Sequence, residues 1–387
     1  MRWKYPDPLD AAEIVERSAV LKKIDAWWQN FQSKTADISA LFKRKQSWDL
    51  ADWMHQHLGA IDPRIMWEYG PGITSGGHRL VITPESTREL RPLVEVILGK
   101  APDISGWEFY PYRPPETLEW AARTVAGRTK GDISRTSFKA EQGGHNRVDL
   151  TFFAPGYTGE DDRQAFNDCF VAIESLLGEE ILDKWIGCID IGQGSGNDTL
   201  PIDQLFANVR ALIHKISGSL PANPCHEFSN SARWTLFEME PEQASDYPRQ
   251  DDMYVGRTML KEMWQSAHSN DCFNSTRFSR NQEIFAYIKL DGTEGLSGEQ
   301  FQDKSEIEDA LDELLIPEKL GCVVGGGTGH RYSYIDLALL NVEKAVESIQ
   351  SLLIKGGVPK RSWIQFFDTD LQNEWIGIWA DSPPPPF

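Results

Sequence analysis

The sequence predicts an α+β fold: N-terminal helices followed by two α/β-sandwich domains with mostly antiparallel sheets. An internally duplicated, ferredoxin-like form is one candidate. Three observations lead to this class. The 387 residues leave room for two or three ordinary domains. Apolar residues recur at helical spacing through residues 9–58. From about residue 64, short alternating runs that indicate strands are interspersed with helical patterns.

Residues 1–60 are predicted to form an N-terminal helical segment. The stretch "DAAEIVERSAVLKKIDAWWQNFQ" places apolar side chains at roughly helical spacing, and "DISALFKRKQSWDLADWMHQHLGAI" repeats the pattern. Asp37 suits the N-cap of the second stretch, because its carboxylate can accept from free backbone N–H groups.

Residues 61–192 are predicted to form a first α+β domain. "RIMWEYGPG" and "HRLVITPE" indicate two strands joined by a hairpin-type loop, and "STRELRPLVEVILGKAP" indicates a helix with Ser86 at its N-cap. A strand "WEFYPYRPP", a helix over 116–126 and two strands over 133–140 and "NRVDLTFFAP" follow. The helix "DDRQAFNDCFVAIESLLGE" and the strand "WIGCIDI" complete the domain.

Residues 193–227 are predicted to be a linker that contains a helix over 202–216, and residues 228–381 a second α+β domain. Its expected strands are "RWTLFEME", "EIFAYIKLDG", "LGCVV", "YSYIDLALL", "SWIQFFD" and "EWIGIWAD". Its expected helices are 254–268, "KSEIEDALDELLIPEK" and "VEKAVESIQSLLIKGG". The tail 382–387 is rich in proline and should be extended.

The two predicted domains contain similar strand–helix–strand stretches. "GGHNRVDLTFF" parallels "GTGHRYSYIDLALL", and "AIESLLGEEILDKWIGCID" parallels "SIQSLLIKGGVPKRSWIQFFD". The shared order and register suggest an internal repeat. Any strand–helix–strand unit of this size could give a similar likeness, so duplication and coincidence both stay open.

The charge and the cysteines limit the classes of function. The net charge is −19, and residues 193–387 hold 16 Lys and Arg against 29 Asp and Glu. Such a chain repels nucleic acid and anionic lipid and attracts basic proteins. No apolar run reaches the ~20 residues that span a bilayer, and the first residues lack the apolar core of a secretory signal. The five cysteines form no CxxC pair, so we expect a reducing, cytoplasmic location with no metal and no cofactor.

The glycine-rich stretch "GCVVGGGTGHRY" (321–332) resembles a phosphate-binding loop in its spacing. Gly327 stands where that loop needs a lysine, and an alternating strand pattern follows where a helix should begin. The stretch therefore favours a glycine turn between two strands. A second interpretation is an anion site made of backbone N–H groups; its residues would be Gly326, Gly327, Thr328, Gly329 and Arg331.

Four further residues are candidates for proton transfer. His145 and His330 fall at equivalent places in the two similar stretches, just before Asp149 and Asp336. Strand alternation would put both aspartates on an exposed sheet face, where a His–Asp pair could act as acid and base. The competing interpretation is an ordinary polar strand face.

The stretch "LVITPESTRELRPLVEVILGKAPDISGWEFYPYRPP", with its "AP-x-I-x-GW-x-F" pattern, and the later "LGE" at 177–179 resemble segments of uncharacterised bacterial protein families. The segment "GGGTGHRYSYIDLAL" resembles another such segment. The resemblance covers most of residues 60–385 and implies a bacterial origin. It implies no activity, cofactor or catalytic residue.

Three functions are compatible with the sequence. The leading hypothesis is a non-enzymatic cytoplasmic protein that binds another protein; its sharper form is an acidic, immunity-type inhibitor of a basic toxin. The alternative is an enzyme or small-molecule binder that uses a cleft between the two half-domains. A structural oligomer is the third.

Overall fold

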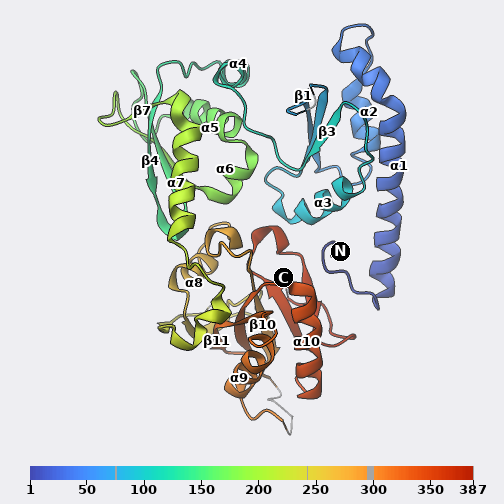
Figure 1. Cartoon of the computed structure of the whole chain (residues 1–387), viewed down its shortest axis with the longest axis vertical. Helices are drawn as coiled ribbons and strands as arrows, with labels where there is room; N and C mark the ends of the chain where they lie inside the picture. Colours follow the sequence, from blue (N-terminus) through green and yellow to red (C-terminus); the bar gives the residue numbers. More distant parts are fainter. Residues whose placement is uncertain (75, 242, 294–299, 387) are drawn as a thin grey trace. The chain divides into compact units, whose positions relative to one another are not determined.

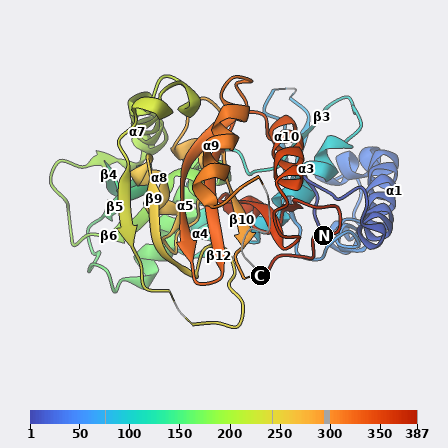
Figure 2. The same cartoon turned by 90° about the horizontal axis from the view of Figure 1, so that it is seen from below.

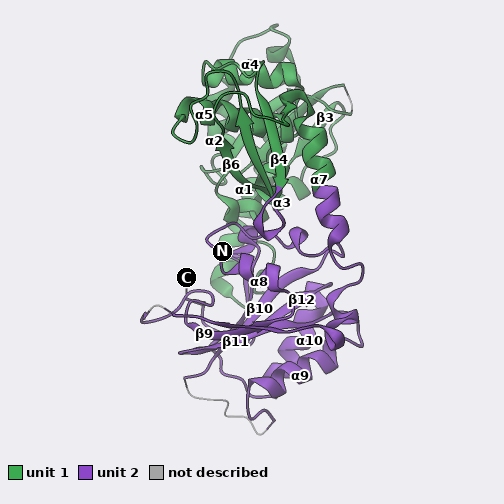
Figure 3. Cartoon of the chain, turned by 90° about the vertical axis from the view of Figure 1, so that its left-hand side faces the viewer, with its two compact units in different colours: residues 1, 3–141, 148–212 green, residues 2, 142–147, 213–387 purple. Residues whose placement is uncertain are grey.

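A computed structural model describes residues 1–74, 76–241, 243–293 and 300–386. The chain divides into two compact units (Figure 3). Unit 1 contains residues 1, 3–141 and 148–212, and unit 2 contains residues 2, 142–147 and 213–387. The elements are labelled in Figure 1. Helices and sheets both contribute, as the predicted α+β class requires.

The N-terminal helices of unit 1 are α1 (Ala11–Phe42) and α2 (Leu50–His57). They share one core with α3 (Arg91–Gly99) and with a small sheet, in which β2 (His78–Thr83) is antiparallel to β1 (Met66–Pro71) and parallel to β3 (Trp107–Tyr110). The Trp28 ring lies 4.8 Å from Phe109, and its Nε1 donates to the carbonyl of Ile97 at 2.7 Å. The helical segment predicted for 1–60 therefore packs together with the start of the predicted first domain.

The predicted cap at Asp37 is wrong. Helix α1 runs unbroken through this position, and Asp37 instead pairs with Lys34 at 2.9 Å. The carboxylates of Asp10 and Asp49 cap α1 and α2.

The second sheet of unit 1 has the order β6-β5-β4-β7. Its strands are β4 (Ser137–Gln142), β5 (Val148–Phe153), β6 (Ile186–Ile191) and β7 (Leu200–Pro201). Strands β5 and β6 are parallel, as expected for a strand–helix–strand unit. The helices are α4 (Leu118–Arg128), α5 (Arg163–Leu177), α6 (Glu179–Trp185) and α7 (Leu205–Ser219), the last of which leads into unit 2.

Unit 2 is built on a seven-stranded antiparallel sheet with the order β14-β13-β10-β12-β11-β9-β8. The strands are β8 (Thr235–Glu238), β9 (Met253–Thr258), β10 (Ile284–Asp291), β11 (Gly321–Gly329), β12 (Tyr332–Leu339), β13 (Ser362–Phe366) and β14 (Trp375–Gly377). The helices are α8 (Lys261–Ala267), α9 (Lys304–Leu315) and α10 (Val342–Lys355). Figure 2 shows β9, β12 and β10 of this sheet, with β11 lying between β9 and β12.

The centre of unit 2 has a ferredoxin-like topology. The chain order β10-α9-β11-β12-α10-β13 combines with the sheet order β13-β10-β12-β11, so each strand–helix–strand unit is split by a strand of the other. Helices α9 and α10 lie on one face of the sheet and α8 on the opposite face (Figure 3). In unit 1, by contrast, β5 and β6 are direct neighbours. The two similar stretches of sequence therefore fold into differently connected sheets.

The predicted helix over 254–268 is wrong in its first half. Residues 253–258 form β9, which pairs with both β8 and β11, and only α8 is helical. Tyr254, Val255 and Thr258 favour strands, and pairing on both edges outweighs a weak helical pattern. Short 3₁₀ turns lie at Arg88–Leu90, Gly144–Asn146, Ile202–Gln204, Cys225–Glu227, Ser229–Ser231, Ser275–Arg277 and Thr369–Leu371.

Within the described residues, every helix is too short or too polar to cross a bilayer.

Candidate functional site

The glycines of β11 alternate along the strand and make room for side chains of the neighbouring strands β9 and β12 and of the residue before β9. A Cβ added at Gly327 would lie 2.0 Å from the Met253 sulfur, and one at Gly329 would lie 2.3 Å from the Asp252 carboxylate. A Cβ at Gly325 would lie 2.8 Å from a carboxylate oxygen of Asp336. All three separations are below van der Waals contact, so only glycine fits at these positions.

The turn after β11 binds a carboxylate of the protein itself. Asp252 is fully buried, and its carboxylate accepts from the backbone N–H groups of Arg331 at 2.7 Å and Tyr332 at 2.8 Å, and from the Tyr334 hydroxyl. The N–H of His330 donates to the Asp252 carbonyl at 3.1 Å. An anion site was one interpretation of this stretch, and here an internal side chain provides the anion.

The other residues of that interpretation lie in the strand. Gly326, Gly327 and Thr328 pair with Ile335, Tyr334 and Ser333 of β12. The Arg331 guanidinium lies 3.7 Å from Asp246 and 3.8 Å from Asp291. These residues build the sheet and the turn around Asp252.

The four proton-transfer candidates have separate partners. His145 lies in unit 2 with its Nδ1 3.6 Å from Asp271, whereas Asp149 lies in unit 1 and accepts from the Cys188 amide at 2.8 Å. The His330 ring is exposed and packs against Tyr254 at 5.6 Å.

Asp336 is fully buried, contrary to the exposed sheet face expected for it. It lies four residues beyond Tyr332, the first residue of β12, and therefore about 13 Å along the strand from the turn. Its face of the sheet is covered, because α8 and the loop between β8 and β9 lie over it.

Asp336 and Gln250 form a buried polar pair under this loop. The Gln250 Nε2 donates to Asp336 Oδ1 at 2.7 Å, while Asp336 Oδ2 and Gln250 Oε1 are buried without a hydrogen-bond partner among the described residues. Burial, which disfavours the charged carboxylate, raises the pKa of Asp336 to about 7. Two acceptor atoms are thus left open beneath the loop.

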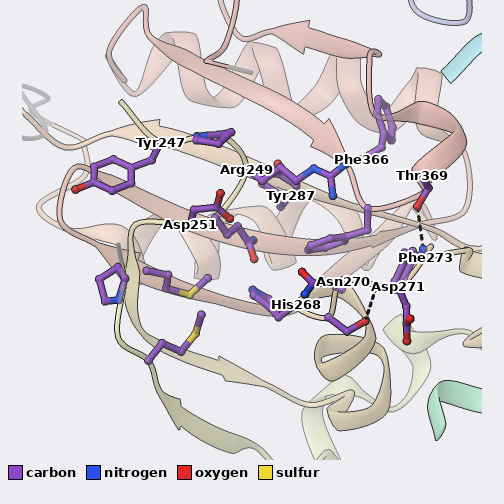
Figure 4. A pocket seen from close by; sticks show the side chains of 18 of the residues that line it. Tyr247, Arg249, Asp251, His268, Asn270, Asp271, Phe273, Tyr287, Phe366 and Thr369 are labelled. Atoms are coloured by element: carbon purple, nitrogen blue, oxygen red, sulfur yellow. Dashed lines mark hydrogen bonds between the residues drawn. The ribbon is translucent and has the colours of Figure 1, made fainter. Parts of the chain in front are cut away.

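A cavity of about 740 Å³ opens on the same face of the sheet. Its walls come from the loop between β8 and β9, from the loop after α8 and from the end of β13, with Tyr287 of β10 at its base (Figure 4). Three carboxylates line it, those of Glu240, Asp251 and Asp271, together with the aromatic side chains of Tyr247, Phe273, Tyr287, Phe366 and Phe367. Arg249 also lines it, and its guanidinium donates to Gln372 at 3.1 Å.

His268 also lines the cavity and has an acceptor without a partner in the described part of the chain. Its ring stacks on Trp264 at 3.9 Å, and its Nδ1 lies 2.8 Å from the Trp264 carbonyl oxygen. That carbonyl can only accept, so Nδ1 carries the proton and Nε2 is an acceptor. Burial lowers the pKa of His268, which keeps the ring neutral. Nε2 is buried without a partner among the described residues.

The loop over the cavity is held from below by Lys289. This side chain is fully buried in β10, and its ammonium donates to the carbonyl of Tyr247. Burial lowers the pKa of Lys289 to about 8. Together with the Asp252 contacts, this hydrogen bond fixes both ends of the stretch from Tyr247 to Asp252.

Reasoning from sequence missed Gln250, Asp252 and His268. The stretch "PEQASDYPRQDD" (241–252) is polar and lacks a helical or strand pattern, and nothing in it says which strands it crosses. Its length was the available signal, because long connections in compact domains often carry function.

Among the residues that the structure describes, no group of three His, Cys, Asp or Glu side chains is placed to hold a metal ion. No family model matches the chain, and neither the curated proteins nor the solved structures contain a significant match to it.

Proposed function

We propose that this protein is a non-enzymatic binding module that takes a basic segment of a partner protein into the cavity of unit 2. One observation carries the proposal: among the described residues, three carboxylates and five aromatic rings line the cavity, against the single guanidinium of Arg249. Cations bind favourably between carboxylates and aromatic faces. An immunity-type inhibitor that masks a basic toxin is the sharper form of this function.

The charge of the surrounding chain supports a basic partner. Residues 193–387 carry 29 acidic against 16 basic side chains. A field of this sign steers a cationic protein toward the surface and accelerates association at low salt.

A small-molecule ligand is the second candidate. The cavity of about 740 Å³ lies within the range of roughly 300–1,000 Å³ that is usual for ligand pockets. The affinity of such a ligand would not depend on whether a basic peptide is attached to it, and this difference distinguishes the two functions.

The test is a titration with basic peptides of mixed sequence and with acidic peptides of the same length. The double variant Glu240→Gln with Asp251→Asn should weaken binding of basic peptides about threefold to tenfold, since exposed charge pairs contribute about 0.2–1 kcal/mol each. The matched control is Asp309→Asn with Glu313→Gln, which removes the same charge from exposed sites on α9, on the opposite face of the sheet. Equal losses in both doubles would mean that the cavity is not the binding site.

A further inference from the structure

We propose that the cavity of unit 2 is an arginine-anchoring site, in which Gln250 Oε1 and His268 Nε2 accept hydrogen bonds from the guanidinium of a partner's arginine side chain. The inference rests on the proposed function and names the chemistry of the group that enters.

Gln250 Oε1 and His268 Nε2 are two hydrogen-bond acceptors that lack a donor among the described residues. Both atoms are buried, and both belong to side chains that line the cavity. A buried polar atom without a partner costs about 1–3 kcal/mol, so such atoms mark places where a ligand completes the hydrogen bonding. The ligand must therefore bring N–H or O–H donors.

The orientation of Gln250 is fixed by its neighbour. Asp336 Oδ1 accepts from the amide nitrogen of Gln250 at 2.7 Å, so the amide oxygen is the atom left for a ligand. In the same way, the Trp264 carbonyl holds the proton of His268 on Nδ1 and leaves Nε2 as the acceptor. His268 cannot supply a donor to the cavity without breaking its hydrogen bond to the Trp264 carbonyl, whereas the second N–H of the Gln250 amide remains beside the open oxygen.

The charged side chains that line the cavity favour a cationic ligand. Asp251, Asp271 and Glu240 line the cavity. Asp271 is 3.4 Å from Arg147 and 3.6 Å from His145, and the cavity's own Arg249 is bonded to Gln372. His268 is neutral, so it does not repel a cation. Among the described residues that line the cavity, acidic side chains outnumber basic ones, so a donor-rich ligand that is also positively charged fits better than a neutral one.

The two acceptors and the aromatic lining favour an arginine side chain over a lysine side chain. The acceptors are an amide oxygen and an imidazole nitrogen on different loops, and the aromatic rings of Phe273 and Tyr287 line the same cavity (Figure 4). A guanidinium is planar, carries five donors in a fixed fork, and stacks on aromatic faces at a low cost of dehydration. A lysine ammonium is a compact, strongly hydrated charge that cannot stack in this way.

The test uses the full chain and three small probes: the N-acetyl amides of arginine, of lysine and of citrulline, which is the neutral isostere of arginine. We expect calorimetric or NMR titration to show saturable binding of the arginine amide. The lysine and citrulline amides should bind at least about tenfold more weakly, since hydrogen bonds to charged groups contribute about 1.5–3 kcal/mol. Equal binding of citrulline would overturn the role of charge, and equal binding of lysine the role of the guanidinium.

Two variants test the named acceptors. Gln250→Met and His268→Phe keep the size of each side chain but remove the acceptor, and each should weaken the arginine amide about tenfold. Gln265→Met and His214→Phe are the same changes at exposed positions and should leave the affinity unchanged. Should either cavity variant fail to fold, the comparison of arginine with citrulline on the unchanged protein still decides.

The outcomes separate this inference from the proposed function. If basic peptides bind but the arginine amide does not, or if both cavity variants bind it normally, the arginine site is refuted while a basic partner stands. If neither the peptides nor the amide bind, both proposals fail.

Discussion

At the scale of single residues, Gly327 gives a direct test of the close packing between β11 and β9. Replacing Gly327 with Ala would place a methyl group 2.0 Å from the Met253 sulfur and 2.4 Å from the Val255 carbonyl oxygen. We expect the free energy of unfolding, measured by urea denaturation, to fall by about 1–3 kcal/mol, because a tightly packed core must shift.

Gly127→Ala is the matched control, since a Cβ there has no atom within 4 Å and the residue lies in α4. It should stabilise the chain by up to about 1 kcal/mol, as alanine has the higher helix propensity. Equal effects at both positions would mean that Met253 and Val255 of β9 do not occupy the space beside Gly327.

Asp336 should make stability depend on pH. The pKa of Asp336 is raised from 3.8 to about 7 in the folded chain, so between these values the folded state binds a proton that the unfolded state releases. This contribution to stability is full below about pH 4, falls as the pH rises, and is gone above about pH 7. The slope is at most roughly 1.4 kcal/mol per pH unit.

Asp336→Asn removes this titration while keeping an acceptor for Gln250. The stability of the variant relative to the unchanged protein should therefore increase from about pH 4 to about pH 7. The stability of Asp203→Asn, at an exposed position, should change with pH in the same way as that of the unchanged protein. A constant difference between Asp336→Asn and the unchanged protein would show that Asp336 is ionised throughout this range.

At this scale the sequence predicted the strand that follows the glycine stretch, but the predicted glycine turn is wrong. The glycines lie within β11, where Gly326 adopts a positive φ of 145°, and the turn falls at His330 and Arg331. The clearance that Gly325, Gly327 and Gly329 provide depends on Met253, Asp252 and Asp336. A single sequence does not reveal such distant neighbours.

At the scale of elements, the turn between β11 and β12 depends on one carboxylate. Asp252→Ala would leave the half-buried Arg331 amide, the buried Tyr332 amide and the Tyr334 hydroxyl without their acceptor. Each orphaned donor costs about 1–3 kcal/mol, so we expect a loss of several kcal/mol in stability. Hydrogen exchange should accelerate at the amides of Arg331 and Tyr332.

Asp252→Asn keeps one acceptor oxygen and should show an intermediate loss. Glu238→Ala, at an exposed position at the end of β8, is the control and should change stability by less than about 0.5 kcal/mol. Unchanged protection of both amides in Asp252→Ala would show that the turn forms without the carboxylate.

The local sequence pattern predicted most helices and strands, and the features that it missed depend on contacts between distant segments. Period and capping residues located the long helices α5, α9 and α10 and the strands β10 to β13. Strand β9 was missed because its pairing with β8 and β11 comes from the tertiary structure. The order of strands, which places β10 between β12 and β13, and the cavity above Tyr287 likewise depend on contacts between distant segments.

At the scale of the whole molecule, the net charge of −19 and the ion pairs predict opposite effects of salt on stability. Salt screens the repulsion among like charges and should stabilise the fold, while it weakens ion pairs. The pairs of Arg91 with Glu179 and of Arg113 with Glu174 are largely buried and are screened little. The exposed pairs contribute only about 0–1 kcal/mol each, so the repulsion should dominate.

We therefore expect the melting temperature to rise as NaCl increases from about 0.02 M to about 0.5 M, over which the screening length falls from roughly 20 Å to roughly 4 Å. The affinity for basic peptides should fall over the same range, because the same screening weakens attraction between opposite charges. KCl at equal ionic strength should give the same two trends. A melting temperature that falls with salt would mean that ion pairs outweigh repulsion, and an affinity that does not change with salt would place the binding energy in apolar contacts rather than in the carboxylates of the cavity.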